Sequence, residues 1–211
     1  MMIVNEFWDM VSLLETVLAH NKLEEPQSIH NISYFTEQIY KEVQLNYPKL
    51  NISDEEIENV SKLATIHDIG KLFTPYEILN KKGKLTKDEM DIIKKHPLNG
   101  ANIALKLPKC GKASKLVQYA YNICLYHHER YDGQGYPKGL IGDEIPLCAQ
   151  VVGLADAYDA LISERPYKRK INHGEAVRMI VNGECGSFSP KVILSFIIAS
   201  MNKMWIEKVS K

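Results

Sequence analysis

The sequence lacks the features that mark membrane and secreted chains. No uninterrupted apolar run approaches the roughly 18 residues of a membrane-spanning helix. The first twenty residues, MMIVNEFWDMVSLLETVLAH, have no basic start and include acidic side chains, which excludes a secretory signal peptide. We therefore expect a cytoplasmic protein that does not associate with a membrane.

An excess of charge of either sign is also missing. The 26 basic residues balance the 26 acidic ones, so the chain has no overall field that would attract it to DNA. Any phosphate must therefore be bound by a local cluster of basic groups. Cysteine is scarce, and no two cysteines form a C-x-x-C pair, which favours reduced thiols in a reducing compartment. The cysteines are Cys110, Cys124, Cys148 and Cys185.

Strand signals are absent, and helical periodicity extends along nearly the whole chain. No alternating apolar pattern or hairpin turn occurs, so we predict an all-α fold. Near the N-terminus, apolar residues recur at steps of three and four, which suits either a core helix or a dimer-forming helix: Phe7, Val11, Leu14 and Leu18. We expect an N-terminal helical appendage over residues 1–25 and one helical domain over residues 26–211.

Turn and capping residues divide the expected domain into helices. Ser53 and Thr86 each begin a capping-box pattern, and a loop rich in glycine follows at residues 132–139. Pro97 is expected to bend or break the helix that contains His96. The expected helices cover residues 28–45, 54 to about 67, 87–96, 112–127, 146–161, 175–182 and 190–209.

Histidines and aspartates gather at or near the ends of four of these helices. Imidazole and carboxylate groups together are ligands for divalent iron, manganese, cobalt or zinc. Adjacent residues on a helix point about 100° apart, so each neighbouring pair is suited to flank two metals. A structural role is a poor alternative, because unpaired polar groups are costly to bury. The group comprises His67, Asp68, His96, His127, His128 and Asp156.

Three blocks of sequence resemble the HD-GYP group of the HD phosphohydrolases: HDIGK at 67–71, HHERYDGQGYPKGL at 127–140 and ADAYDALISERPYK at 155–168. The resemblance implies an all-helical HD-type domain and a metal-dependent phosphodiesterase. It implies hydrolysis of a cyclic dinucleotide, cyclic di-GMP first, to a linear dinucleotide or GMP by a hydroxide that bridges the metals. Some members of the group prefer cyclic GMP-AMP. Iron or manganese is the expected metal, with nickel, cobalt and zinc as alternatives.

The resemblance also carries roles to individual positions. It implies metal ligands at His30, His67, Asp68, His96, His127, His128 and Asp156. It implies substrate contacts at Lys71, Gly135, Tyr136, Pro137, Arg165 and Lys168.

The residues themselves suggest how some of these side chains act. If the helix persists, Lys71 shares a face with His67, four residues earlier, and reaches a phosphate oxygen beside the metals. Arg165 offers a fork for two bonds to phosphate. Asp159, three residues after Asp156, is a candidate to orient a ligand histidine or to assist proton transfer. The catalytic candidates are therefore Asp68, Lys71 and Asp159.

Three positions depart from the pattern of the group. Pro26 stands where three-metal members have glutamate, which favours two metals. Ser33 replaces the group's usual arginine, and Phe188-Ser189-Pro190 replaces its Phe-Asp-Pro. Neither of the last two changes removes a predicted ligand, but both bear on substrate preference.

Two other functional classes stay open. One is an HD phosphohydrolase that acts on a nucleoside mono- or triphosphate. The other is an inactive module that binds a cyclic dinucleotide, or that docks a diguanylate cyclase or another regulatory protein. A homodimer through the N-terminal helix would suit either class.

Overall fold

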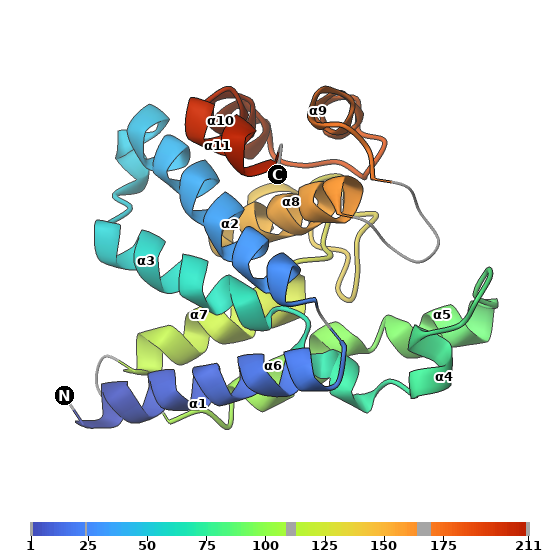
Figure 1. The fold of residues 1–211 in the computed structure, drawn as a ribbon. Coiled ribbons are helices and arrows are strands. Elements are labelled where there is room, and N and C mark those ends of the chain that lie inside the picture. The colour runs from blue at the N-terminus through green and yellow to red at the C-terminus, as the bar shows by residue number, and fades with distance from the viewer. Residues whose placement is uncertain (1, 24, 109–112, 164–169, 210–211) are drawn as a thin grey trace.

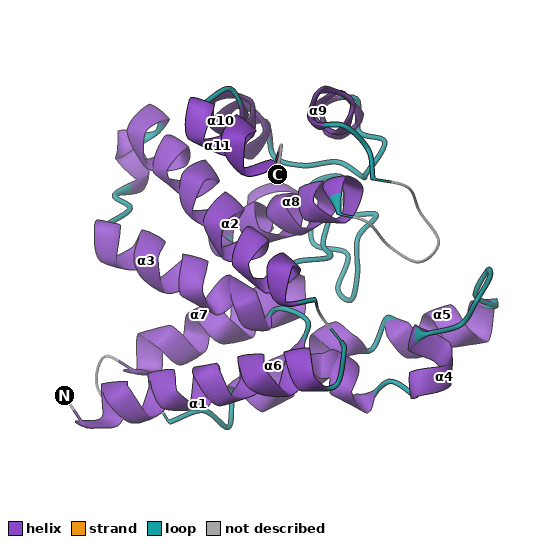
Figure 2. Cartoon of the chain, in the orientation of Figure 1, coloured by secondary structure: helices purple, strands orange, loops and turns teal. Residues whose placement is uncertain are grey.

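The computed structural model describes residues 2–23, 25–108, 113–163 and 170–209 (Figure 1). Within these ranges all regular elements are helices, and the one extended pairing is an isolated bridge between Asp132 and Ile141 (Figure 2). The all-α prediction is confirmed. None of the described helices combines the length and apolar character needed to cross a bilayer.

The described helices follow one another with short connections. The α-helices are α1 (Met2–His20), α2 (Pro26–Asn46), α3 (Asp54–Leu63), α4 (Tyr76–Leu79), α5 (Lys87–Ile93), α6 (His96–Ala104), α7 (Ala113–Tyr126), α8 (Leu147–Ile162), α9 (His173–Val181), α10 (Pro190–Ser200) and α11 (Lys203–Val209). The 3-10 helices are η1 (Pro48–Leu50), η2 (Ala64–Ile66), η3 (Ile69–Phe73) and η4 (Gly142–Glu144).

Three of the expected helices were wrong in extent. The helix expected over residues 87–96 ends at Ile93, and Pro97, which was expected to bend or break it, lies in the first turn of a separate helix, α6, that begins at His96. Proline is tolerated there because the first backbone N–H groups of a helix have no partner within it.

The helix capped by Ser53 ends at Leu63, and the chain tightens into η2 and η3, which places His67 and Asp68 in the turn between them. The last expected helix divides into α10 and α11. There the side chain of Asn202 accepts a hydrogen bond from the backbone N–H of Met204 (3.0 Å), which satisfies a free donor at the start of α11.

The body of the protein is built around α2 and α7. Helix α2 packs against α3, α8 and α10, whereas α7 packs against α6 and α8 (Figure 1). The first helix belongs to the same core, because Phe7, Val11 and Leu18 are buried and α1 contacts η2, η3 and α7. This placement suits the core-helix alternative, while the division of the chain at residue 25 stays a prediction.

Aromatic packing holds the C-terminal helices on α2 and α8. Trp205 of α11 is fully buried, and its indole N–H donates to the Tyr158 hydroxyl oxygen (3.0 Å). The same hydroxyl lies 2.7 Å from Nδ1 of His173 at the start of α9. Phe35 stacks near the indole at 4.6 Å between ring centroids. This cluster fixes α8, the helix that contributes Asp156 to the predicted site.

Helix α5 begins with a complete capping box. The Thr86 hydroxyl accepts from the Glu89 backbone N–H (3.3 Å), and the Glu89 carboxylate accepts from the Thr86 N–H (2.7 Å). We predict that Thr86→Ala destabilises this short helix by about 1 kcal/mol. Amide hydrogen exchange should then quicken in residues 87–93 and stay unchanged in α7.

The control is Thr16→Ala, which removes an exposed hydroxyl from the middle of α1 that bonds only to the Ser12 carbonyl oxygen. Equal exchange in residues 87–93 of wild type and Thr86→Ala would contradict the predicted role of the cap.

Candidate metal centre

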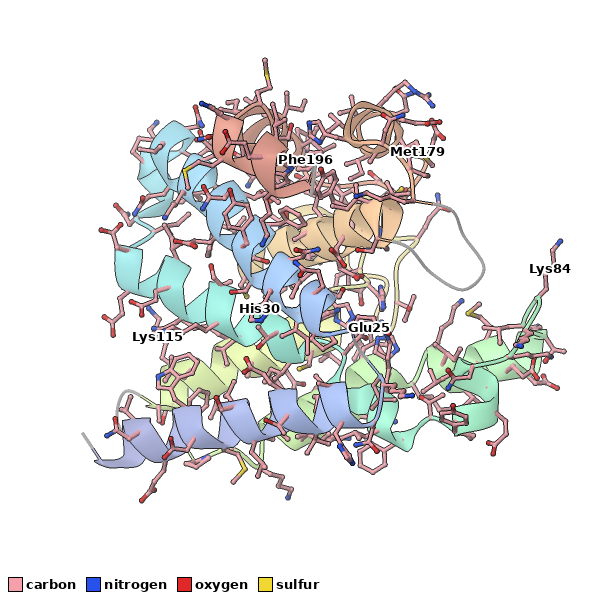
Figure 3. The ribbon with its side chains drawn as sticks, viewed as in Figure 1. Glu25, His30, Lys84, Lys115, Met179 and Phe196 are labelled. Atoms are coloured by element: carbon pink, nitrogen blue, oxygen red, sulfur yellow. The ribbon has the colours of Figure 1, made fainter. Side chains whose placement is uncertain are left out.

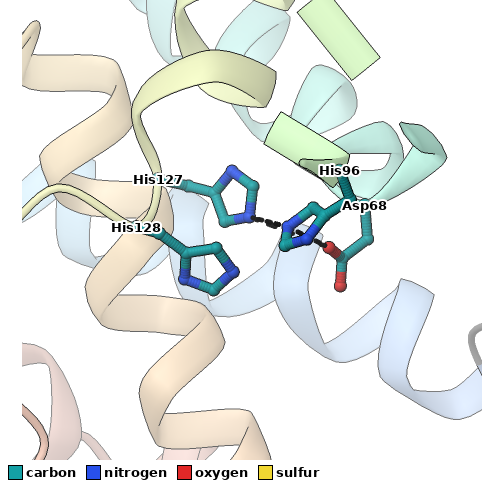
Figure 4. A group of neighbouring side chains, drawn as sticks. All are labelled: Asp68, His96, His127 and His128. Atoms are coloured by element: carbon teal, nitrogen blue, oxygen red, sulfur yellow. Dashed lines mark hydrogen bonds and ion pairs between the residues drawn. The ribbon is translucent and has the colours of Figure 1, made fainter. Parts of the chain in front are cut away.

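Four side chains from three separate parts of the chain converge in the interior. Asp68 comes from the turn after η2, His96 begins α6, and His127 and His128 follow the end of α7. Each offers one ligand atom, and these atoms all lie within 4.8 Å of one another (Figure 4). Apart from the partly exposed His128, the residues are buried.

Two more predicted ligands border this group. Nε2 of His67 lies 3.3 Å from Oδ2 of Asp68 and 3.7 Å from Oδ1 of Asp156, which α8 contributes. The structure thus brings together six of the seven predicted ligands. His30 lies exposed near the start of α2 (Figure 3) and is not a member of the close group of four. Its assignment as a ligand stays a prediction.

Backbone carbonyl groups orient three of the imidazoles. A carbonyl oxygen can only accept, so each contacted Nδ1 carries a proton, and in the neutral imidazole Nε2 then keeps a free lone pair. Each carbonyl lies three or four residues before its histidine, and those of Ala64 and Ile123 also accept the backbone N–H of the same histidine (3.2 Å each). The contacts are His67 Nδ1 to Ala64 O (2.8 Å), His96 Nδ1 to Ile93 O (2.8 Å) and His127 Nδ1 to Ile123 O (2.9 Å).

These tautomers leave lone pairs facing one another. Nε2 of His96 lies 3.3 Å from Nε2 of His127, and neither nitrogen has a proton to share if both are neutral. Oδ1 of Asp68 lies 3.0 Å from Nε2 of His96. Among the described residues, neither this oxygen nor the buried Nε2 of His67 has a hydrogen-bond partner of normal geometry. Such a concentration of buried lone pairs fits a divalent metal, which accepts electron density from all of them.

The charges hold Asp68 and His128 in their metal-binding protonation states. At His67, burial acts to lower the pKa, but the Asp68 and Asp156 carboxylates outweigh it and raise that pKa well above its usual value. Burial acts to raise the pKa of Asp68, but the Lys71 ammonium and neighbouring imidazoles outweigh it and hold that pKa well below its usual range. The Lys71 Nζ forms an ion pair with the Asp68 carboxylate. Burial, together with His127, lowers the pKa of His128 well below its usual value. At neutral pH the carboxylate is therefore ionised and the His128 imidazole is neutral.

The glycine-rich loop closes one side of the group. A Cβ on Gly135 would lie 2.3 Å from the Arg130 backbone nitrogen, so only glycine fits this approach. The next residue, Tyr136, stacks on the His128 ring at 4.7 Å and 26°. Its backbone N–H also donates to the His128 carbonyl oxygen (3.2 Å). Two predicted substrate positions thus lie beside a predicted ligand, with Pro137 exposed next to them.

Other predicted residues fall in different places. Arg165 and Lys168 lie outside the described residues. Lys71 belongs to η3, so the expected helical face shared with His67 was wrong, although its ammonium does reach the group through Asp68. At this point Gly70 packs closely on the backbone of α6.

The Asp159 carboxylate is buried and binds groups outside the close group of four. It accepts from Asn31 Nδ2 (2.8 Å), from Ser163 Oγ (3.1 Å) and from Ser28 Oγ. These bonds tie the first turns of α2 to the end of α8. Its catalytic assignment stays a prediction, and the contacts favour a positioning role. Sequence reasoning missed Ser28 and Asn31, because partners more than a hundred residues away leave no local signal.

Sequence reasoning also missed Glu129. The residue follows His128 directly, inside the block quoted for the family resemblance, and its carboxylate is buried. The sequence offered only an acidic residue just after an apolar helix. Such a residue can be buried or exposed, and the sequence pattern does not tell which.

Comparisons with known proteins identify the family of the chain. The family model for the HD domain matches residues 17–192. A probable cyclic di-GMP phosphodiesterase of Vibrio cholerae is 44% identical over 152 residues, covering 72% of this chain and 34% of the relative. A cyclic di-GMP phosphodiesterase response regulator of Xanthomonas campestris is 38% identical, covering 76% of this chain and 41% of the relative. The chain therefore spans less than half the length of these curated relatives.

Solved structures share the fold. A cyclic GMP-AMP-specific phosphodiesterase of Vibrio cholerae superposes with a TM-score of 0.58 at 16% identity, covering 96% of this chain and 50% of that one. A protein of Bdellovibrio bacteriovorus described as an HDG"Y"P protein gives a TM-score of 0.54 at 24% identity, covering 78% of this chain and 51% of that one. The chain belongs to the HD domain family, and the resemblance of its motifs to the HD-GYP group is confirmed.

Proposed function

We propose that this chain is a metal-dependent phosphodiesterase that hydrolyses a cyclic dinucleotide, with cyclic di-GMP as the first candidate. One observation carries the proposal. The buried Nε2 atoms of His96 and His127 lie 3.3 Å apart, beside the Asp68 carboxylate. Among the relatives, those named for cyclic di-GMP reach 44% identity, and one named for 3'3'-cGAMP reaches 37%.

The chain's residues divide the work between metal binding and substrate binding. Two divalent ions, iron or manganese first, would acidify a bound water and neutralise phosphoryl charge when held by the predicted ligands. Asp68 stays ionised because the Lys71 ammonium and the neighbouring imidazoles together lie against it. The ammonium of Lys71 is half-buried at the edge of the group, and its role in the proposal is to hold a phosphoryl oxygen. Tyr136 forms the wall beside His128 and offers a face on which a base can stack.

Arg165 and Lys168 are proposed to hold the substrate phosphates, as the family resemblance implies. In the sequence they come three and six positions after the last residue of α8, the helix that contributes Asp156. A guanidinium can engage phosphate through two parallel bonds, which suits Arg165 for orienting a diester rather than only attracting it.

The test is a substrate panel on metal-loaded protein. The chain is purified without oxygen, loaded with Fe(II) or Mn(II), and incubated with cyclic di-GMP, 3'3'-cGAMP and bis(4-nitrophenyl) phosphate. Products are separated by chromatography, and metal per chain is measured on the same sample. We expect turnover of cyclic di-GMP with about two metals per chain. Preferential cleavage of 3'3'-cGAMP would reassign the substrate. Full metal loading without turnover of either cyclic dinucleotide would refute the proposal.

Replacing Lys71 separates substrate stabilisation from metal binding. Lys71→Met keeps the length of the side chain but removes the ammonium, so we expect turnover to fall about 10²-fold with metal per chain unchanged. The measurements are kcat and metal content. The matched control is Lys84→Met at the exposed tip between α4 and α5 (Figure 3), which should leave both unchanged. Loss of metal from Lys71→Met would show that the lysine acts on the ligands instead.

A further inference from the structure

We propose that Glu129 is a positioning residue, whose buried carboxylate holds the loop of residues 130–141 so that Tyr136 stays against His128. The consequence for substrate binding rests on the proposed function, whereas the effect on the loop does not. Glu129 is 4% exposed and follows the two predicted ligands His127 and His128 in the chain.

Both carboxylate oxygens of Glu129 are engaged with the far side of the loop. Oε1 accepts from the backbone N–H of Lys138 (2.7 Å), and Oε2 accepts from that of Leu140 (3.0 Å). Hydrogen bonds to an ionised acceptor are about twice as strong as neutral ones. The carboxylate therefore holds Lys138 and Leu140, at the end of the loop, close to its first residues.

Tyr136 lies between the points at which the loop is attached. Before it, Gly135 packs directly on the Glu129 and Arg130 backbone, and a Cβ there would lie only 2.4 Å from the Glu129 Cα. After it, Lys138 and Leu140 are the residues that bind the carboxylate. The position of the Tyr136 ring on His128 thus depends on both attachments.

The contact between Tyr136 and Lys94 also depends on where the loop holds the Tyr136 ring. Nζ of Lys94 lies 5.4 Å from the centroid of the Tyr136 ring. Lys94 immediately follows α5 and stands two residues before His96. Tyr136 therefore contacts both His128, a predicted ligand, and Lys94, which lies close to His96 in the sequence. If the loop were displaced, the Tyr136 ring would no longer cover this side of the metal group.

A second acidic residue of the same region provides a matched comparison. The Glu144 carboxylate accepts from the Ile141 backbone N–H (2.9 Å), but Glu144 is exposed. Water can replace an exposed acceptor, so this bond should matter little. Both residues are glutamates that accept from backbone N–H groups near the end of the loop. They differ in burial and in the number of these bonds, which is two for Glu129 and one for Glu144.

The first experiment is amide hydrogen exchange on the metal-loaded full chain, comparing wild type, Glu129→Gln and Glu144→Gln. Glutamine preserves size but replaces one acceptor oxygen with an N–H donor. We expect exchange in residues 131–141 of Glu129→Gln to rise about tenfold, with α7 unchanged and Glu144→Gln like wild type. Unchanged exchange in the loop, or an equal rise throughout the chain, would overturn the proposal.

The second experiment asks whether the effect passes through Tyr136. Glu129→Gln should raise KM for cyclic di-GMP about tenfold and keep the metal content of wild type. The double variant with Tyr136→Ala should have the KM of Tyr136→Ala alone, because coupled residues are not additive. If the increases in KM of the two single variants instead multiplied in the double variant, Glu129 would not act through Tyr136. If wild type itself turns over no cyclic dinucleotide, the proposed function fails, and the exchange experiment still decides the role of Glu129.

Discussion

Replacing Asp68 by alanine is expected to abolish both metal retention and turnover. One oxygen of this carboxylate lies 3.0 Å from Nε2 of His96 and 3.7 Å from Nε2 of His127. The other lies 3.3 Å from Nε2 of His67 and pairs with Lys71. Asp68 is thus the anion that contacts three of the predicted imidazole ligands. Without it, a cation would face the Lys71 ammonium with less negative charge to offset the repulsion.

We expect metal per chain to fall to near zero and turnover by more than about 10³-fold in Asp68→Ala. Metal is measured by elemental analysis after gel filtration, and circular dichroism checks that the helices persist. Asp91→Ala, which removes an exposed carboxylate on α5, is the control and should match wild type. Near wild-type activity of Asp68→Ala would rule out the metal-centre model. Lost activity with full metal content would limit Asp68 to a role in the reaction itself.

Gly70→Ala is expected to damage the site through the backbone. A Cβ at this position would lie 2.0 Å from the His96 carbonyl oxygen and 2.5 Å from the Gly100 nitrogen. Both are main-chain atoms of α6, so no side chain can move aside, and η3 must separate from α6. We expect destabilisation on the order of 3 kcal/mol, as for severe overpacking. The separation also moves His96 away from Asp68, so the variant should retain less metal.

Urea unfolding of the metal-free protein measures the stability, and metal titration of the folded variant measures the affinity. The control is Gly174→Ala at the start of α9, where an added Cβ meets only the Asn172 side-chain oxygen at 3.7 Å. It should change stability by less than about 1 kcal/mol. Equal stability and metal affinity of Gly70→Ala and wild type would show that the contact between η3 and α6 is not needed.

Much of the helical structure was predictable because its causes are local. The capping box at Thr86 formed as its sequence predicted, and the periodic apolar residues Phe7, Val11 and Leu18 are buried. The limits of prediction appear at His67, where the expected α-helix gives way to 3-10 turns. In the same segment Gly70 packs on the backbone of α6, some thirty residues later, and the local pattern does not encode such a contact.

By itself, the sequence determined the all-helical class, the family resemblance and six predicted ligands that prove to be neighbours. These follow from residue types, periodicity and motif spacing. Only the tertiary structure decided which atoms meet. It turned the Nδ1 atoms of His67, His96 and His127 toward backbone carbonyls, left His30 exposed, and used Asp159 to join α2 to α8. It also placed Glu129 beneath the glycine-rich loop. Side-chain direction and burial arise from packing between distant segments, and that information is not present in the spacing of residues along the chain.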